Sequence, residues 1–120
     1  REPTACETFP VVWKPRDGAG SAATFRLSAA LDVAVAKARR AAERHTGPMI
    51  LQEFVPGLAA SVALLCGPAG NVPLAPAFQV LSDDGRFHYL GGELPIPSDL
   101  ADRATRLAKR AVGCVLGPLG

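Results

Sequence analysis

A lysine followed by a glycine-rich loop is the first feature of this sequence that could do chemistry. The stretch "VVWKPRDGAGS" covers residues 11–21 and contains Lys14, Gly18, Gly20 and Ser21. Because a residue before proline is biased towards an extended backbone, we expect Lys14 to be held at the end of a strand, beside the loop. Glycines let backbone N–H groups approach an anion, and Ser21 adds a hydroxyl donor. A fixed ammonium beside such amides is suited to a triphosphate.

This stretch is not a Walker A loop, because the lysine precedes the glycines and no Gly-Lys-Ser/Thr follows them. Glycine-rich hairpins are common, and a lysine at the end of a strand is often only exposed. The residues of this stretch alone therefore leave two alternatives open, a phosphate-binding loop and a flexible turn after a strand.

A second stretch, "ILQEFVPG" at residues 50–57, places Gln52 and Glu53 inside an otherwise apolar strand. Buried carboxylates and amides are costly unless they have partners. One alternative is a strand at the edge of a sheet, with Glu53 in water. The other is a cleft in which an adenine lies among Leu51, Phe54 and Val55 and polar groups recognise its edge.

The elements that must position these residues follow from periodicity. "FPVVWKP" predicts a strand with Val11 and Trp13 on one side, and "ATFRL" predicts a second strand that returns antiparallel after the loop. "SAALDVAVAKARRAAERHTG" predicts a helix over residues 28–47 with Ser28 as N-cap. Its expected apolar face consists of Leu27, Leu31, Val35, Ala38 and Ala42.

The second half of the chain predicts further strands and a helix. "SVALLC" is apolar throughout, as expected of a strand covered on both faces. "VPLAPAFQVLS" and "FHYLGG" predict a hairpin through the turn "DDGR". The last helix is expected to begin at Ser98, with acidic residues in its first turn. Its expected buried face consists of Leu100, Ala104, Leu107, Ala111 and Val115.

Composition predicts an ordinary cytoplasmic globular protein. The 120 residues are 48% hydrophobic and 20% charged, with a net charge of +2, and their cations are spread out instead of clustered as nucleic-acid binding requires. No apolar run approaches the roughly 20 residues of a membrane span, and from the polar opening "REPTACET" we expect no signal peptide. Three cysteines without a CxxC pair, at Cys6, Cys66 and Cys114, predict reduced and mostly buried thiols.

Taken in order, these motifs resemble the ATP-grasp superfamily, and within it the carboxylate–amine ligases that include the archaeal tyramine–glutamate ligases. The resemblance is carried by "FPVVWKPRDGAGS" and "ILQEFVPGLAASVALL", and "VPLAPAFQVL" and "YLGGELPIP" extend it over nearly the whole chain. It implies an α+β fold. Residues 9–56 would form a small nucleotide-clasping lobe of strand, glycine-rich loop, strand, helix and strand, and residues 57–120 would form part of a central lobe.

The resemblance also implies roles for individual residues. Lys14 matches the lysine that reaches the phosphates of ATP. The mobile loop that closes over the phosphates is matched by Asp17, Gly18, Ala19, Gly20 and Ser21. The segment that joins the lobes at the adenine is matched by Gln52, Glu53, Phe54 and Val55, with the Glu53 carbonyl and the Val55 N–H recognising the base.

The implied chemistry is phosphorylation of a small carboxylate substrate by ATP, with Mg²⁺, to an acyl phosphate that an amine then attacks. Two departures from the family pattern stand out. Ala59 occupies the position where many members have a ribose-contacting Glu. No acidic segment ending in Glu-x-Asn precedes Gly120, so we expect the metal ligands beyond Gly120 and none within the chain.

We therefore expect a fragment of a longer ligase, without the family's first lobe and without turnover by itself, whose final "GPLG" leads to further sequence. Exposed sheet edges in such a fragment would favour a homo-oligomer. Gln79 and Arg86 are candidate substrate contacts; the alternatives are an amide on an edge strand and a solvated turn residue. The alternative for the whole chain is a non-catalytic α+β module that binds an anion or a partner through the loop.

Overall fold

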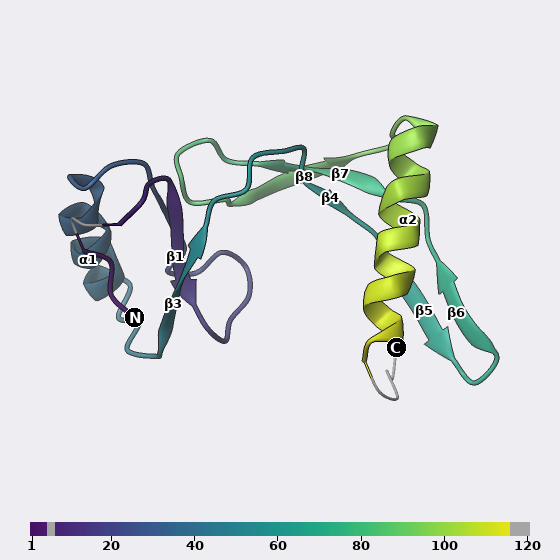
Figure 1. Cartoon of the computed structure of the whole chain (residues 1–120), viewed down its shortest axis with the longest axis horizontal. Helices are drawn as coiled ribbons and strands as arrows, with labels where there is room; N and C mark the ends of the chain where they lie inside the picture. Colours follow the sequence, from purple (N-terminus) through teal and green to yellow (C-terminus); the bar gives the residue numbers. More distant parts are fainter. Residues whose placement is uncertain (5–6, 116–120) are drawn as a thin grey trace. The chain divides into compact units, whose positions relative to one another are not determined.

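The structure, a computed structural model, describes residues 1–4 and 7–115. It is an α+β fold, as the sequence predicts, with small antiparallel sheets and two helices (Figure 1). The elements in chain order are β1 (Val11–Pro15), β2 (Phe25–Leu27), α1 (Asp32–Ala42), β3 (Met49–Glu53), β4 (Ala60–Ser61), β5 (Leu64–Gly67), β6 (Gly70–Pro73), β7 (Ala77–Leu81), β8 (Tyr89–Glu93) and α2 (Ser98–Gly113).

The chain divides into two compact units. The first unit contains Arg1–Gly57 and Leu81–Tyr89, and the second contains Leu58–Val80 and Leu90–Gly120. The first division falls after Gly57, one residue beyond the lobe boundary that we expected at residue 56. Residues 81–89, which we had grouped with the rest of 57–120, belong to the first unit.

The first unit is built on an antiparallel sheet in the order β2-β1-β3. Val11 pairs with Leu27 on β2 and with Glu53 on β3, and Lys14 pairs with Ile50. Burial alternates along β1 as predicted, with Val11 and Trp13 buried and their neighbours half-buried. The "ATFRL" strand is confirmed as β2, so the glycine-rich loop is the connection of a β-hairpin.

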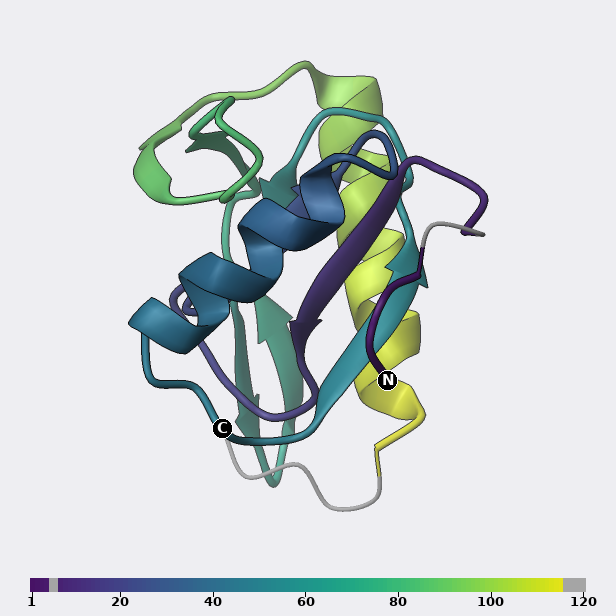
Figure 2. The ribbon, with the colours of Figure 1, turned by 90° about the vertical axis from the view of Figure 1, so that its left-hand side faces the viewer.

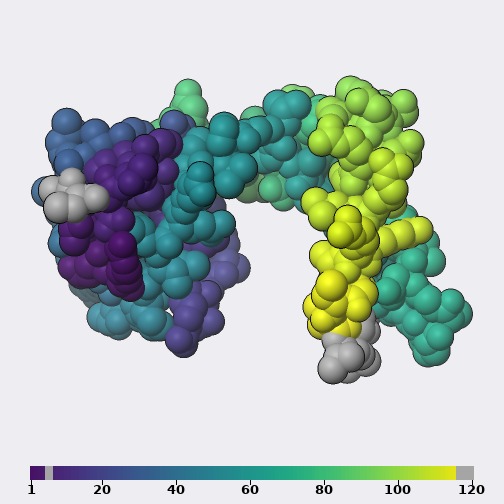
Figure 3. Space-filling model, viewed as in Figure 1, coloured from purple at the N-terminus to yellow at the C-terminus, as the bar shows by residue number. Residues whose placement is uncertain are grey.

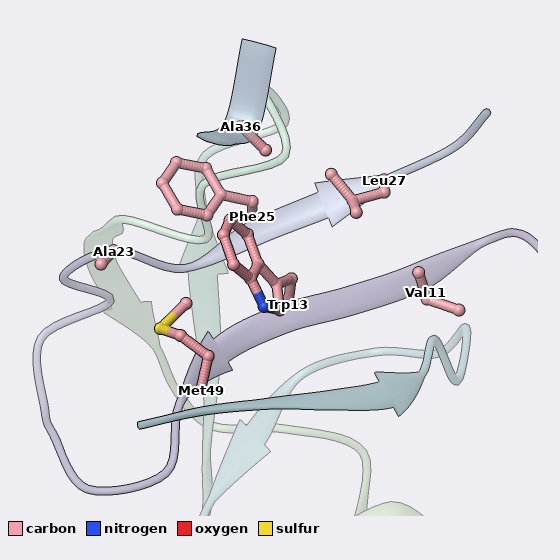
Figure 4. Close-up of a cluster of buried hydrophobic side chains, with 7 residues drawn as sticks. All are labelled: Val11, Trp13, Ala23, Phe25, Leu27, Ala36 and Met49. Atoms are coloured by element: carbon pink, nitrogen blue, oxygen red, sulfur yellow. The ribbon is translucent and has the colours of Figure 1, made fainter. Parts of the chain in front are cut away.

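Helix α1 covers one face of this sheet (Figure 2), and the core lies between them (Figure 4). Trp13 is fully buried at its centre, with the Phe25 ring 5.8 Å away between centroids. The buried cluster consists of Val11, Trp13, Ala23, Phe25, Leu27, Ala36 and Met49. This packing fixes β1, and with it the position of Lys14.

The predicted start and apolar face of α1 are wrong. The helix begins at Asp32, its N-cap is Leu31, and the Asp32 carboxylate instead accepts hydrogen bonds from the N–H groups of Ser28 and Ala29. Leu31 is 77% exposed, whereas Ala36 is buried. The reason is that Leu27 belongs to β2, so a helical period counted from it selects the wrong face.

The second unit contains the sheet β4-β7-β8, the hairpin β5-β6 and helix α2. "SVALLC" is not one strand covered on both faces: it divides between β4 and β5, and Leu65 is 60% exposed. The hairpin through "DDGR" is confirmed by β7 and β8, and the last helix begins at Ser98 as predicted.

The predicted buried face of α2 is wrong as well. No residue of this helix is buried, and Leu107 is 66% exposed. Among the described residues of the second unit only Ile96 is a buried hydrophobic side chain, so the short sheets offer the helix little to pack against. The thiols are also less buried than predicted, since Cys66 is half-buried and Cys114 is exposed. Cys6 and "GPLG" lie outside the described residues.

Candidate functional site

The face of the β2-β1-β3 sheet that points away from α1 carries the candidate site. Paired residues of an antiparallel sheet have their side chains on the same face, and successive residues alternate. Since Trp13 points into the core, the register places five other side chains on the opposite face: Val12, Lys14, Arg26, Ile50 and Gln52. Helix α1 lies on the other face (Figure 2), and on this one Arg26 and Gln52 are exposed.

Lys14 is half-buried at the end of β1, and its ammonium forms no hydrogen bond or ion pair with any described residue. It lines a hollow of about 230 Å³ together with residues of the glycine-rich loop, Gly18, Ala19 and Ser21 among them. The structure therefore brings the lysine and the loop together around one space, as the sequence predicts. A cation without a protein partner in such a hollow can bind an anion.

The first half of the loop is exposed and offers free backbone donors. The N–H groups of residues 17–21 donate to no other described residue. Gly20 has a positive φ of 66°, which glycine adopts without strain. In Figure 3 the blue-violet atoms of the loop protrude from the first unit. Consecutive free amides of this kind form concavities that bind phosphate.

The second half of the loop is held in place by residues far away in sequence. Ser21 Oγ donates a hydrogen bond to the carbonyl of Phe87 at 2.6 Å, so its proton is not free for a phosphate here. The N–H of Ala23 donates to Glu43 Oε2 at 2.8 Å, and the carbonyl of Thr24 accepts from Arg86 Nε at 2.9 Å.

Glu43 and Arg86 form an ion pair that connects α1 with the turn at residues 82–88, which we call the 82–88 turn. Burial by itself would raise the pKa of the Glu43 carboxyl. The hydrogen bond from the Ala23 N–H, and the hydrogen bond and positive charge of Arg86, outweigh burial and hold this pKa below its usual value. The carboxylate therefore stays ionised and keeps both contacts.

Arg86 is not the solvated turn residue that we considered. Its side chain is only 13% exposed, and its guanidinium lies 4.5 Å above the centre of the Phe25 ring. Its donors to Glu43 and Thr24 are engaged in contacts within the first unit. Its predicted contact with a substrate remains a prediction.

Gln52 and Glu53 are exposed, and β3 is an edge strand of its sheet, which agrees with the first alternative that the sequence left open. The backbone geometry also bears on adenine recognition. The Phe54 N–H donates to the Pro10 carbonyl at 3.2 Å, so Val11 and Glu53 form a non-hydrogen-bonded pair. The N–H and C=O of Glu53 consequently point away from β1, towards the free edge of the sheet.

The segment at residues 52–54 lines a different hollow from that of Lys14. This second hollow measures about 530 Å³ and also includes Pro10 and Leu51. The Phe54 side chain packs under the guanidinium of Arg26, 4.2 Å from its carbon to the ring centre, and stacks on Phe87 at 6.3 Å. Val55 is 74% exposed.

Gln79, the other candidate for a substrate contact, lies in the second unit. Gln79 is exposed on β7, and its backbone N–H donates to the carbonyl of Ala59 at 2.8 Å. Sequence reasoning missed Glu43 and Phe87, because neither their types nor their spacing indicates that they meet the loop. The only available signal was the "DDG" turn, which predicted a hairpin tip but not its neighbours.

Within residues 1–4 and 7–115, no group of three His, Cys, Asp or Glu side chains could hold a metal ion. No helix that the described residues form has the length and apolar character needed to span a membrane.

A glycine-rich hairpin loop, an unpaired strand-end lysine and an edge strand on one small sheet define an α+β domain suited to nucleotide phosphates. Comparison with known families agrees: the profile of the ATP-grasp domain matches residues 2–120. The chain belongs to the ATP-grasp family, whose domains bind ATP and Mg²⁺ and are generally part of ligases. No curated protein matches the sequence.

Proposed function

We propose that this chain contributes the nucleotide-binding part of an ATP-dependent carboxylate–amine ligase, with Lys14 and the glycine-rich loop on the phosphates. The observation that carries the proposal is the unpaired ammonium of Lys14 in one hollow with the loop. An ammonium that no protein group neutralises, beside free backbone amides, is available to an anionic ligand. A nucleotide triphosphate supplies that charge and acceptors for the free amides as well.

The free edge of β3 supports adenine binding next to this site. The Glu53 carbonyl points outwards. Val55 precedes Pro56, which favours an extended backbone, and such a backbone would turn the N–H of Val55 to the same edge. One acceptor and one donor at this spacing match the amino group and ring nitrogen of adenine. Lys14 pairs with Ile50 on β3, and Glu53 follows Ile50 by three residues. This separation is about 10 Å along the strand. This is comparable with the length of a ribose and its first phosphates.

In the reaction we propose, a carboxylate oxygen of the substrate attacks the γ-phosphorus, ADP leaves, and an acyl phosphate forms. The amine then attacks the acyl carbon, and inorganic phosphate leaves as the amide bond forms. Lys14 and the loop amides stabilise the charge on the phosphoryl oxygens during transfer. The loop, once it is closed over the phosphates, excludes water that would hydrolyse the acyl phosphate. The choice of carboxylate and amine as substrates rests on the resemblance to that branch of the family.

The test is ATP binding by calorimetry, on the chain and on its Lys14→Ala variant. Loss of a charged contact to phosphate predicts an affinity about tenfold to a hundredfold lower for Lys14→Ala. Lys109→Ala is the matched control, since it removes an exposed lysine of α2 in the second unit. Lys14→Arg keeps the charge and should retain most of the affinity.

Equal binding of ATP by the wild type and by Lys14→Ala would contradict the proposal. Binding of inorganic triphosphate with the affinity of ATP would instead favour the alternative, a module that binds anions through its loop without recognising adenine.

A further inference from the structure

The 82–88 turn is internally braced and rests against the β2 edge of the first unit. Ser82 Oγ donates to Asp84 Oδ1 at 2.7 Å, and the same carboxylate oxygen accepts the Arg86 N–H at 3.0 Å. Gly85, with a φ of 79°, places its carbonyl 2.7 Å from the N–H of Arg26. A turn with its own hydrogen bonds and a backbone bond to β2 can act as a rigid support.

This support holds the glycine-rich loop at two places directly and at a third through Glu43. The carbonyl of Phe87 accepts the Ser21 hydroxyl, and Arg86 Nε donates to the carbonyl of Thr24. Between them, Arg86 fixes Glu43, which accepts the N–H of Ala23. Every one of these contacts is on the half of the loop after Gly20, whereas residues 17–21 keep their amides free. Distant residues thus hold the half of the loop after Gly20, whereas residues 17–20 form no hydrogen bond with a distant residue.

The turn also reaches the segment proposed for adenine. The ring of Phe87 stacks on that of Phe54, whose other contact is the Arg26 guanidinium. Phe87 has a φ of 56°, a conformation that a bulky residue adopts only where its surroundings impose it. One strained residue therefore joins the loop, through its carbonyl, to the Phe54 segment, through its ring.

We infer that Arg86 and Glu43 are positioning residues for the phosphate-binding loop, acting through the 82–88 turn. They hold residues 21–24 so that the free amides of residues 17–21 stay pre-organised beside Lys14. Neither side chain needs to touch the nucleotide. The expected effect on ATP affinity rests on the proposed function. The effect of Arg86 and Glu43 on residues 21–24 can be tested without nucleotide.

The first measurement is amide hydrogen exchange in the free protein, on the wild type, Arg86→Ala and Glu43→Ala. Exchange at Ala23, and at the neighbouring residues 21–24, should become at least about tenfold faster in both variants, because the N–H of Ala23 loses its held acceptor. Glu43→Gln keeps an oxygen acceptor and should show a smaller change. Arg39→Ala is the matched control, since it removes an exposed arginine of α1 whose side chain makes no hydrogen bond or ion pair with the loop.

The second measurement compares ATP with adenosine on the same variants. A positioning role for the phosphate loop predicts a roughly tenfold loss of ATP affinity in Arg86→Ala and an unchanged affinity for adenosine. A general loss of fold would weaken both ligands equally. Arg86→Lys, which keeps the charge but not the guanidinium contacts with both Glu43 and Thr24, should lie between the wild type and Arg86→Ala.

Unchanged exchange at residues 21–24 in both alanine variants overturns the inference, whatever the nucleotide results. Faster exchange with equal losses for ATP and adenosine also overturns it, because the turn would then be only structural. If exchange is faster in the variants but the wild type binds no ATP, the positioning role of Arg86 and Glu43 is supported and the proposed function is rejected.

Discussion

Ser21 and Phe87 are 66 positions apart in the sequence, and the hydroxyl of Ser21 donates to the carbonyl of Phe87 at 2.6 Å. Both residues have positive φ angles, 59° and 56°. Two L-residues in this region carry backbone strain, and the hydrogen bond between them compensates part of it. The contact holds the second half of the glycine-rich loop against the 82–88 turn.

The two glycines of the loop should respond differently to the same substitution. Gly20→Ala forces a residue with a Cβ into a φ of 66° although the Cβ itself meets nothing within 4 Å. We expect a cost of about 1 kcal/mol in the free energy of unfolding and a weaker affinity for ATP. Urea unfolding and calorimetry measure the two effects.

Gly18→Ala is the matched control, because Gly18 has no positive φ and its Cβ would meet Pro15 Cβ at 3.4 Å and Pro15 Cγ at 3.8 Å, which is ordinary contact. We expect a change within about 0.5 kcal/mol. Equal costs for the two variants would show that φ at Gly20 is not what the loop requires.

Replacement of Trp13 should destabilise the whole first unit. The side chain is 0% exposed, packs on Phe25 and lies under the Arg40 guanidinium, 5.3 Å from its carbon to the ring centre. Trp13→Ala should cost about 3–5 kcal/mol, which is comparable with the total stability of a small domain. Circular dichroism and urea unfolding measure the loss, and Leu90→Ala, at a residue 67% exposed, should be nearly neutral.

Glu43 predicts a pH dependence of stability. Its pKa in the folded protein is below the ordinary value, so the unfolded chain binds more protons as the pH falls towards about 4. The stabilisation by Glu43 is therefore fully present above its unfolded pKa and is lost as the pH falls through the folded pKa. We expect the free energy of unfolding to decrease from about pH 5 downwards.

Glu43→Gln should flatten this decrease, since the amide keeps an acceptor for Ala23 but does not titrate. Asp84, whose pKa is also lowered, first by the Ser82 hydroxyl and then by the Arg86 N–H, acts in the same direction and is present in both proteins. An identical pH profile for wild type and Glu43→Gln would mean that the ion pair with Arg86 contributes nothing.

The adenine proposal assigns recognition to backbone groups and not to the Glu53 carboxylate. Glu53→Ala should therefore leave ATP affinity within about twofold of the wild type. Val55→Pro removes the N–H and should weaken ATP by about tenfold, as loss of one hydrogen bond to a neutral group does. Val55→Ala keeps the N–H and serves as control; an equal loss in Val55→Ala would assign the effect to the side chain.

The features of the fold that depend on neighbouring residues could be predicted from the sequence. Period-two alternation predicted the buried face of β1, the residue before Pro15 predicted an extended Lys14, and turn chemistry predicted the hairpin between β7 and β8. The helices were located, but their buried faces were not. The apolar residues of α1 and α2 outnumber those that meet a sheet, so periodicity alone could not select Ala36 over Leu31.

By itself, the sequence determined the α+β class, the family pattern and the position of a lysine beside a glycine-rich loop, since these depend on neighbouring residues. Only the tertiary structure decided which half of that loop is held. The contacts of Ala23 with Glu43 and of Ser21 with Phe87 join segments separated by 20 and 66 positions. Such pairs form because the chain folds back on itself, and no short-range pattern in residue type records where it does so.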